Sequence, residues 1–220
     1  MKIVFQGGSL TECNRKKEDP FDIGDGYVAK AAEFLRESYP NADFTFFNRG
    51  VSGDRTWDLL KRWQRDVIDL QPDILTLLIG INDTWRRYDQ NDPTSLEEYE
   101  HNLRTLLEDV KANTNAKILM IEPFLVDMDD TLPHIVDKNM HAWREDFDPK
   151  IQVFRRMAYE YADGFLPMDG IMAMMCAELS VKYFSVDGIH LIEPGCAAMG
   201  GFVADALRRI IDTILEDRHV

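Results

Sequence analysis

Three residue types that together make a nucleophilic site occur in two short motifs near opposite ends of the chain. Ser9 lies in Gly-Gly-Ser-Leu (residues 7–10), and Asp187 and His190 lie in Asp-Gly-Ile-His (residues 187–190). A serine hydroxyl attacks a carbonyl well only when a base removes its proton, and a histidine held by a carboxylate is such a base. We therefore predict Ser9 as nucleophile, His190 as general base and Asp187 as the group that orients it.

Two further motifs contain groups that can stabilise the negative oxygen formed in such an attack. They are Gly-Val-Ser-Gly-Asp (residues 50–54) and Gly-Ile-Asn-Asp (residues 80–83). The backbone N–H groups of Ser9 and Gly53 and the side-chain amide of Asn82 are the predicted oxyanion donors. Losing one such donor typically slows acyl transfer by about 100- to 1000-fold.

Each motif alone has a commoner explanation. Gly-Gly-Ser after a strand is usually a turn, and Ser52 or Asp54 could cap a helix. Asn82 and Asp83 could cap a helix or form an Asx-turn, and residues 187–190 could be a surface turn. The functional interpretation rests on the four motifs occurring together.

The elements that would position these residues alternate along the chain. Short β-rich runs are expected at 2–6, 43–48, 74–79, 117–122 and 164–167, and helices at 27–38, 57–70, 96–111, 149–161 and 194–215. The run at 74–79 is almost wholly apolar, which is typical of a parallel strand covered on both faces. This alternation predicts one domain, residues 1–220, built as an α/β sandwich around a mostly parallel sheet.

The predicted strand ends bring the motifs together. Ser9, Gly53 and Asn82 follow the first, second and third strands, and parallel strands end at the same edge of a sheet. Ligands of open α/β sheets bind beyond this edge. We therefore expect the three residues to share one site.

Composition limits the partners. The chain has 220 residues, with 39 acidic and 25 basic side chains and a net charge of −14. Such a charge repels nucleic acid and anionic membranes but not neutral sugars or uncharged esters. No apolar run approaches the ~20 residues of a membrane span, and no secretory signal is apparent. The three cysteines, Cys13, Cys176 and Cys196, lack a pairing pattern, which favours reduced thiols in the cytoplasm.

The remaining polar residues suggest no metal site, and we predict that the protein needs no cofactor. The histidines outside the 187–190 motif lack metal-ligand spacing. The stretch 124–148 is long and charged, and contains His134, His141 and Trp143. We expect it to be a functional or mobile loop, or to contain a short helix.

The four motifs together resemble the SGNH, or GDSL-type, family of serine hydrolases. The similar blocks are residues 7–13, 48–54, 80–83 and 187–190, in the family's order. The resemblance implies a flavodoxin-like, three-layer α/β/α sandwich with a five-stranded sheet, and the site roles proposed above. Gly8 is a departure, because the family usually has Asp before its serine, and this puts full activity in question.

A longer signature resembles the branch of the family that contains acetylxylan esterases. It comprises residues 79–89, with 63–68 and 122–124 in support. Trp85 could stack on a sugar or wall a small acyl pocket, although packing under a loop explains it equally well. Arg86 and Arg87 are expected to form salt bridges.

These observations favour a serine esterase that removes small acyl groups, most simply acetyl, from a small-molecule or oligosaccharide ester through an acyl-enzyme. One alternative is a lysophospholipase or thioesterase on the same fold. Another is a catalytically weakened carbohydrate-binding relative, which Gly8 would suit. A homo-oligomer is an expectation without a specific motif.

Overall fold

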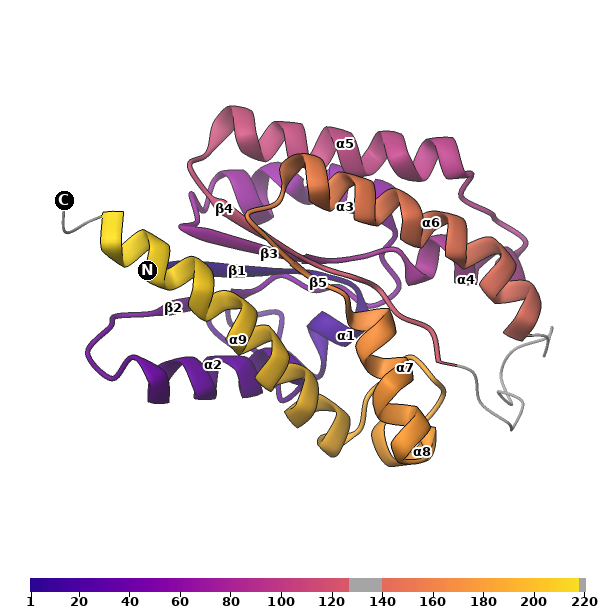
Figure 1. The fold of residues 1–220 in the computed structure, drawn as a ribbon. Coiled ribbons are helices and arrows are strands. Elements are labelled where there is room, and N and C mark those ends of the chain that lie inside the picture. Colours follow the sequence, from indigo (N-terminus) through magenta and orange to yellow (C-terminus); the bar gives the residue numbers. More distant parts are fainter. Residues whose placement is uncertain (127–139, 218–220) are drawn as a thin grey trace.

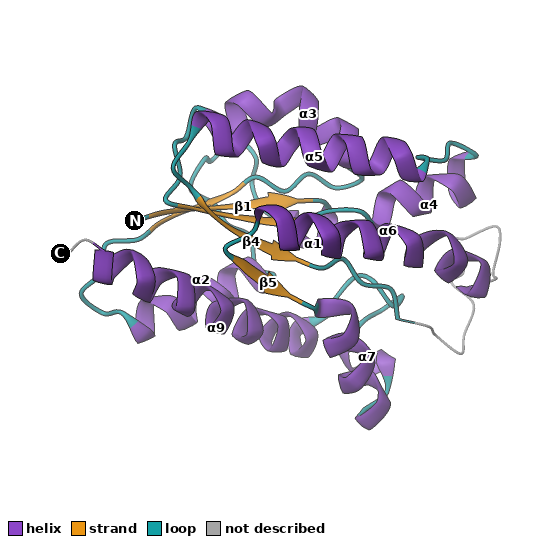
Figure 2. Ribbon diagram, turned by 45° about the horizontal axis from the view of Figure 1, so that its top comes forward, coloured by secondary structure: helices purple, strands orange, loops and turns teal. Residues whose placement is uncertain are grey.

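A five-stranded parallel sheet forms the centre of the computed structural model, which describes residues 1–126 and 140–217 (Figures 1 and 2). The strand order is β2-β1-β3-β4-β5. The strands are β1 (Lys2–Gly7), β2 (Thr45–Asn48), β3 (Ile74–Leu78), β4 (Lys117–Ile121) and β5 (Gly164–Leu166). All four pairings are parallel. The chain therefore brings its strand-ending motifs to one edge, as predicted.

Helices cover both faces of this sheet (Figure 1). Helices α2 (Tyr27–Ser38) and α9 (Glu193–Asp217) pack on one face. Helices α3 (Thr56–Trp63), α5 (Leu96–Asn113) and α6 (Met140–Tyr161) pack on the other. Side chains alternate along a strand, so Ile3 and Phe5 join the first core and Val4 joins the second. The three-layer α/β/α prediction is confirmed.

Two predicted helices differ from those observed. The helix expected at 57–70 is α3 followed by a π-helical segment, η1 (Gln64–Ile68). The helix expected to begin at Pro149 begins instead at Met140 and runs through the proline, which forfeits one backbone hydrogen bond. Packing compensates for that loss, because Trp143 and Phe147 are fully buried in a third apolar cluster. The last part of the expected loop 124–148 is thus helical, while 127–139, with His134, lie outside the described residues.

Four helices were not anticipated. They are α1 (Ser9–Glu12), α4 (Ile81–Gln90), α7 (Met168–Glu178) and α8 (Val181–Phe184). The first two matter for the site, because each begins immediately beyond a strand and contains a predicted functional residue. Within the described part of the chain, none of the helices combines the length and apolar character needed to span a membrane.

Candidate active site

Ser9 is the first residue of α1, directly beyond the end of β1. Gly8 precedes it as the N-cap residue, with a non-helical backbone conformation of φ −95° and ψ −143°. This tight strand-to-helix turn leaves the Ser9 side chain half-buried at the carboxyl edge of the sheet. Its Oγ lies 2.8 Å from Nε2 of His190, although 181 positions separate the two residues in sequence.

Asp187 holds the other side of the His190 ring. Its Oδ2 lies 2.6 Å from His190 Nδ1, and its Oδ1 accepts the backbone N–H groups of Ile189 and His190 at 3.0 and 2.6 Å. Burial works to raise the pKa of the Asp187 carboxyl, but the hydrogen bonds from the His190 ring and backbone outweigh it and leave the pKa below its ordinary value. Asp187 is therefore ionised and fixes Nδ1 as the protonated nitrogen, so that Nε2 can accept the serine proton.

A buried serine that sequence reasoning missed shapes this histidine loop. Ser185 Oγ accepts the N–H groups of Asp187 and Gly188 at 3.3 and 2.9 Å and donates to the carbonyl of His190 at 2.8 Å. An antiparallel bridge between Ser185 and Leu191 closes the loop at its base. A serine two residues before an aspartate gives no distinctive signal in sequence, so only the folded loop reveals it.

The two predicted oxyanion segments lie beside Gly8, which precedes Ser9: a Cβ placed on Gly8 would lie 3.3 Å from Asn82 Nδ2 and 3.8 Å from the Asp54 carbonyl. Gly53 has a φ of +86°, a left-handed conformation that side-chain-bearing residues rarely adopt. Asn82 is buried at the start of α4, and its Nδ2 donates to the carbonyl of Asp54 at 3.0 Å. An amide nitrogen carries two hydrogens, so one remains for a substrate oxygen.

Asp83, next to Asn82 on α4, is hydrogen-bonded to the first residue of α3, Thr56. Its carboxylate accepts the backbone N–H of Thr56 at 3.3 and 3.2 Å and the Thr56 hydroxyl at 2.7 Å. Complete burial raises the pKa of Asp83 to about 7, although the Thr56 hydrogen bonds act to lower it. Asp83 therefore neither caps its own helix nor faces solvent, but joins α4 to the start of α3.

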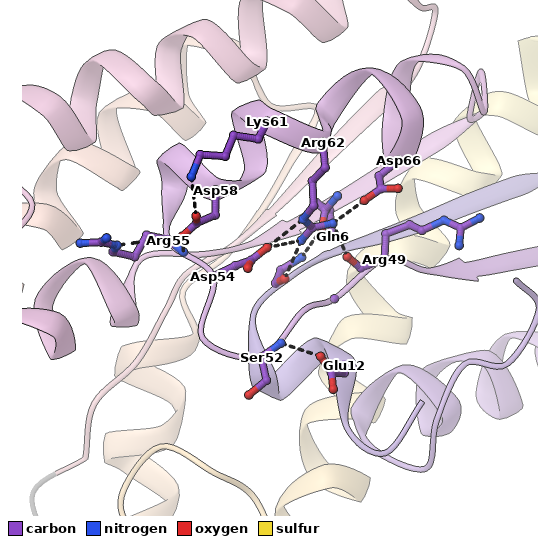
Figure 3. A network of polar contacts seen from close by, with 12 residues as sticks. Gln6, Glu12, Arg49, Ser52, Asp54, Arg55, Asp58, Lys61, Arg62 and Asp66 are labelled. Carbon is purple, nitrogen blue, oxygen red and sulfur yellow. Dashed lines mark hydrogen bonds and ion pairs between the residues drawn. The ribbon is translucent and has the colours of Figure 1, made fainter. Parts of the chain in front are cut away.

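Arg62, which was not singled out from the sequence, holds the loop of residues 49–54 that contains Gly53 (Figure 3). Its Nε and Nη2 donate to Asp54 Oδ2 at 2.8 and 2.7 Å, and Nη1 donates to Asp66 Oδ2 at 2.6 Å. Further hydrogen bonds reach the carbonyls of Arg49, at 2.7 Å, and Gly7, at 3.4 Å. The four-residue spacing from Arg62 to Asp66 signals a helical ion pair, but the partner Asp54 appears only in the folded protein.

Three aromatic side chains, Trp85, Trp143 and Tyr88, pack in a row next to the His190 ring. The Trp85 ring centroid lies 5.7 Å from that of His190 and 5.5 Å from that of Trp143, which stacks on Tyr88 at 4.8 Å. Trp85 is 8% exposed, so it offers little free ring face for a sugar. Trp85 thus packs against the His190 ring. Arg86 and Arg87 pair with Asp89 and Asp146, as expected.

A small cavity opens beside Ser9. Its volume is about 20 Å³, and its walls include Gly8, Ser9, Asn82, Pro123 and Phe124. A cavity needs about 10–15 Å³ to hold one water molecule, so this one has room for a methyl-sized group. Within the described residues, no cluster of His, Cys, Asp or Glu is arranged to hold a metal ion.

Sequence and structural relatives identify the family. The GDSL-like lipase/acylhydrolase family model matches residues 5–198, which include all four motifs. The chain belongs to the GDSL-like lipase/acylhydrolase family. Family membership accounts for the shared order of the serine, glycine, asparagine and histidine blocks along this chain.

Individual relatives agree with this family. The chain is 39% identical over 134 residues to an acetylxylan esterase from Geobacillus stearothermophilus, an alignment spanning 57% of this chain and 61% of that protein. A crystal structure of an acetylxylan esterase from the same organism superposes with a TM-score of 0.78 at 29% identity, covering 94% of this chain and 92% of the other. A putative GDSL-like lipase from Parabacteroides merdae superposes with a TM-score of 0.87 at 30% identity, covering 93% and 94%.

Proposed function

We propose that this protein is a serine esterase that removes acetyl groups from carbohydrate esters. The observation that carries the proposal is the line from Ser9 Oγ to His190 and on to Asp187, with contacts of 2.8 and 2.6 Å. Solved forms of the Geobacillus stearothermophilus enzyme include catalytic mutants in which a serine, an aspartate or a histidine is replaced by alanine. Its aspartate and histidine have the same spacing as Asp187 and His190 here.

The reaction follows from the geometry. His190 Nε2 takes the Ser9 proton as Oγ attacks the ester carbonyl, and Asp187 stabilises the imidazolium that forms. The N–H groups of Ser9 and Gly53 and the Asn82 amide receive the developing oxyanion. His190 then returns the proton to the departing alcohol. Water, activated by the same histidine, releases the acyl group from Ser9.

The size of the cavity beside Ser9 supports a short acyl group. A space of about 20 Å³, close to the room that one water molecule needs, matches the methyl of an acetyl group. This favours acetyl esters over the lysophospholipase and thioesterase alternatives. The similarity to acetylxylan esterases and the net charge of −14, which does not repel neutral sugars, support a carbohydrate as the alcohol.

Two broader expectations accompany the proposal. A cytoplasmic location, where short oligosaccharides would be the available esters, stays a prediction from the lack of a pairing pattern among Cys13, Cys176 and Cys196 in the sequence. A homo-oligomer stays a prediction.

An ester panel tests the proposal. Purified protein is assayed on nitrophenyl acetate, butyrate and octanoate and on acetylated xylo-oligosaccharides, beside Ser9→Ala. We expect activity to fall steeply with acyl length, release of acetate from the sugars, and loss of activity in Ser9→Ala. Activity that rises towards octanoate would contradict the acetyl preference, and full activity in Ser9→Ala would contradict the site.

A further inference from the structure

Arg86 is hydrogen-bonded to one of the predicted oxyanion donors, Asn82, and lies near the other segment at Gly53. It lies one helical turn after Asn82 on α4, on the same helix face. Its Nη2 donates to Asn82 Oδ1 at 3.4 Å, while its Nη1 pairs with Asp89. The Arg86 side chain is 18% exposed, so the helix and its partners hold the guanidinium in place.

Gly53 lies near the same guanidinium nitrogen. A methyl group placed on Gly53 would lie 3.6 Å from Nη2 of Arg86 and would meet no other atom within 4 Å outside its immediate neighbours. Nη2 of Arg86 is therefore the nearest atom on the side of Gly53 where a side chain would project. The same nitrogen that binds Asn82 thus lies near a segment 29 positions earlier in the sequence.

The Asn82 contact decides which end of that amide faces the substrate. The oxygen and nitrogen of an asparagine amide have nearly the same shape, but only the nitrogen can donate to an oxyanion. A guanidinium has donors and no acceptor, so it can satisfy only Oδ1. In the observed orientation, Oδ1 accepts from Arg86 and Nδ2 donates to the Asp54 carbonyl. In the flipped orientation, the amide nitrogen would face the Arg86 donor and the amide oxygen would face the Asp54 carbonyl, so both hydrogen bonds would be lost.

The positive charge of Arg86 should also stabilise the oxyanion. Formation of the tetrahedral intermediate turns a neutral carbonyl oxygen into an anion beside Gly53 and Asn82. A fixed positive charge at that place is felt most strongly in the transition state, so it raises kcat more than it tightens substrate binding. Asp89 neutralises part of this charge, which limits the effect.

We propose that Arg86 is a positioning residue of the oxyanion hole, which fixes the Asn82 amide with its donor towards the substrate and places positive charge beside Gly53. This role rests on the proposed esterase function. A helix-stabilising ion pair with Asp89 is the simpler alternative, and it would change stability without changing kcat selectively.

The test compares Arg86→Gln and Arg86→Lys with Arg87→Gln. Arg87 is the matched control, because it is the adjacent arginine on α4 and its pairing with Asp146 at 3.1 Å involves neither oxyanion segment. Values of kcat and KM are measured on nitrophenyl acetate at a temperature where circular dichroism shows every variant folded. The rate of inactivation by a dialkyl nitrophenyl phosphate, which also needs the oxyanion hole, is measured in parallel.

We expect Arg86→Gln to lower kcat by about 10- to 100-fold with KM changed by less than about threefold, and to slow inactivation similarly. Arg86→Lys should recover part of kcat, since it keeps the charge but not the fork of donors. Arg87→Gln should stay within about twofold of wild type. An Arg86→Gln kcat equal to that of Arg87→Gln, in a folded protein, overturns the role of Arg86.

The two proposals fail separately. If wild type hydrolyses acetyl esters and Ser9→Ala does not, the esterase function stands whatever Arg86→Gln does. If wild type has no Ser9-dependent hydrolysis, both the function and the role of Arg86 are overturned.

Discussion

Replacing Arg62 with methionine should strongly destabilise the protein, because the Arg62 guanidinium neutralises two poorly exposed carboxylates. The side chains of Arg62, Asp54 and Asp66 are 12%, 14% and 8% exposed. Asp66 keeps a second partner in Arg65, at 2.7 Å, whereas the ion pairs of Asp54 described here are with Arg62 alone. The variant therefore leaves the Asp54 carboxylate without its cation and removes the Arg62 donor from the Arg49 carbonyl, while the Gly7 carbonyl keeps the N–H of Val51 at 3.1 Å.

The magnitude follows from these partners. Removing one member of a buried ion pair costs about 3–5 kcal/mol, and the slight exposure of this group together with the remaining Arg65 bond reduces that to about 2–4 kcal/mol. For a domain of this size each kcal/mol lowers Tm by about 2–4 °C. We expect Arg62→Met to lose about 5–15 °C in Tm, measured by circular dichroism and differential scanning calorimetry.

The loss should also depend on pH. Burial already holds the pKa of Asp54 above its ordinary value, even though Arg62 acts to lower it. Without Arg62 the pKa rises further, so Asp54 becomes protonated as the pH falls and the uncompensated charge disappears. The difference in unfolding free energy between wild type and Arg62→Met should therefore be larger at pH 8 than at pH 5.

Arg65→Met provides the matched control. Arg65 pairs with the same Asp66, but its side chain is 75% exposed, and exposed pairs contribute about 0–1 kcal/mol. If Arg62→Met melts within 1–2 °C of Arg65→Met (roughly the shift expected from a surface pair), or if its deficit is the same at pH 5 and pH 8, the assigned role of Arg62 is wrong.

Three other predictions concern residues around Ser9. Asp187→Asn should lower kcat by about 10⁴-fold with little effect on folding, because the neutral amide no longer holds His190 in the tautomer that accepts a proton at Nε2. Stopped-flow ester hydrolysis measures kcat, and a loss of less than about tenfold contradicts the prediction. Asp83 has a folded pKa of about 7, above its unfolded value, so its contribution to stability is fully present below about pH 4 and is lost as the pH rises through 7. Urea unfolding of wild type and Asp83→Asn should accordingly show wild type losing stability relative to the variant between pH 5 and pH 8, and parallel pH profiles would count against this. Gly8→Asp should lower kcat by about tenfold or more, and Gly8→Ala by less. The reason is that a Cβ at position 8 comes 3.3 Å from Asn82 Nδ2, where a carboxylate would compete for the amide hydrogen. A gain in kcat in Gly8→Asp would refute this interpretation.

The sheet and the proposed Ser9, Asp187 and His190 site could be predicted because each depends on short-range information. Apolar runs such as 74–79 indicate buried parallel strands, and strand order then places Ser9, Gly53 and Asn82 at one edge. The spacing of Asp187 and His190 suffices for one to brace the other. These features of the fold appear as expected, and the observed Ser9–His190 contact of 2.8 Å agrees with the predicted pairing.

The supporting residues could not be predicted, because they depend on how elements pack. Helix α4 is rich in polar residues, and it is held by Trp85 and Tyr88 against the third apolar cluster rather than by a regular apolar face. Because this helix was not predicted, there was no reason in the sequence to place Asn82 and Arg86 one helical turn apart on the same face. Arg62 likewise needs the fold to bring Asp54 within reach. Trp85 could be named, but its burial beside His190 required coordinates.

Active-site labelling tests the central claim most directly. Wild type and His190→Ala are incubated with a fluorophosphonate, and the modified residue is located and its rate of formation measured by mass spectrometry of peptides. We predict a single rapid adduct on Ser9 in wild type and labelling slower by at least about 1000-fold in His190→Ala, because the base is absent. An adduct on another residue, or equal labelling rates in the two proteins, would contradict a Ser9 nucleophile activated by His190.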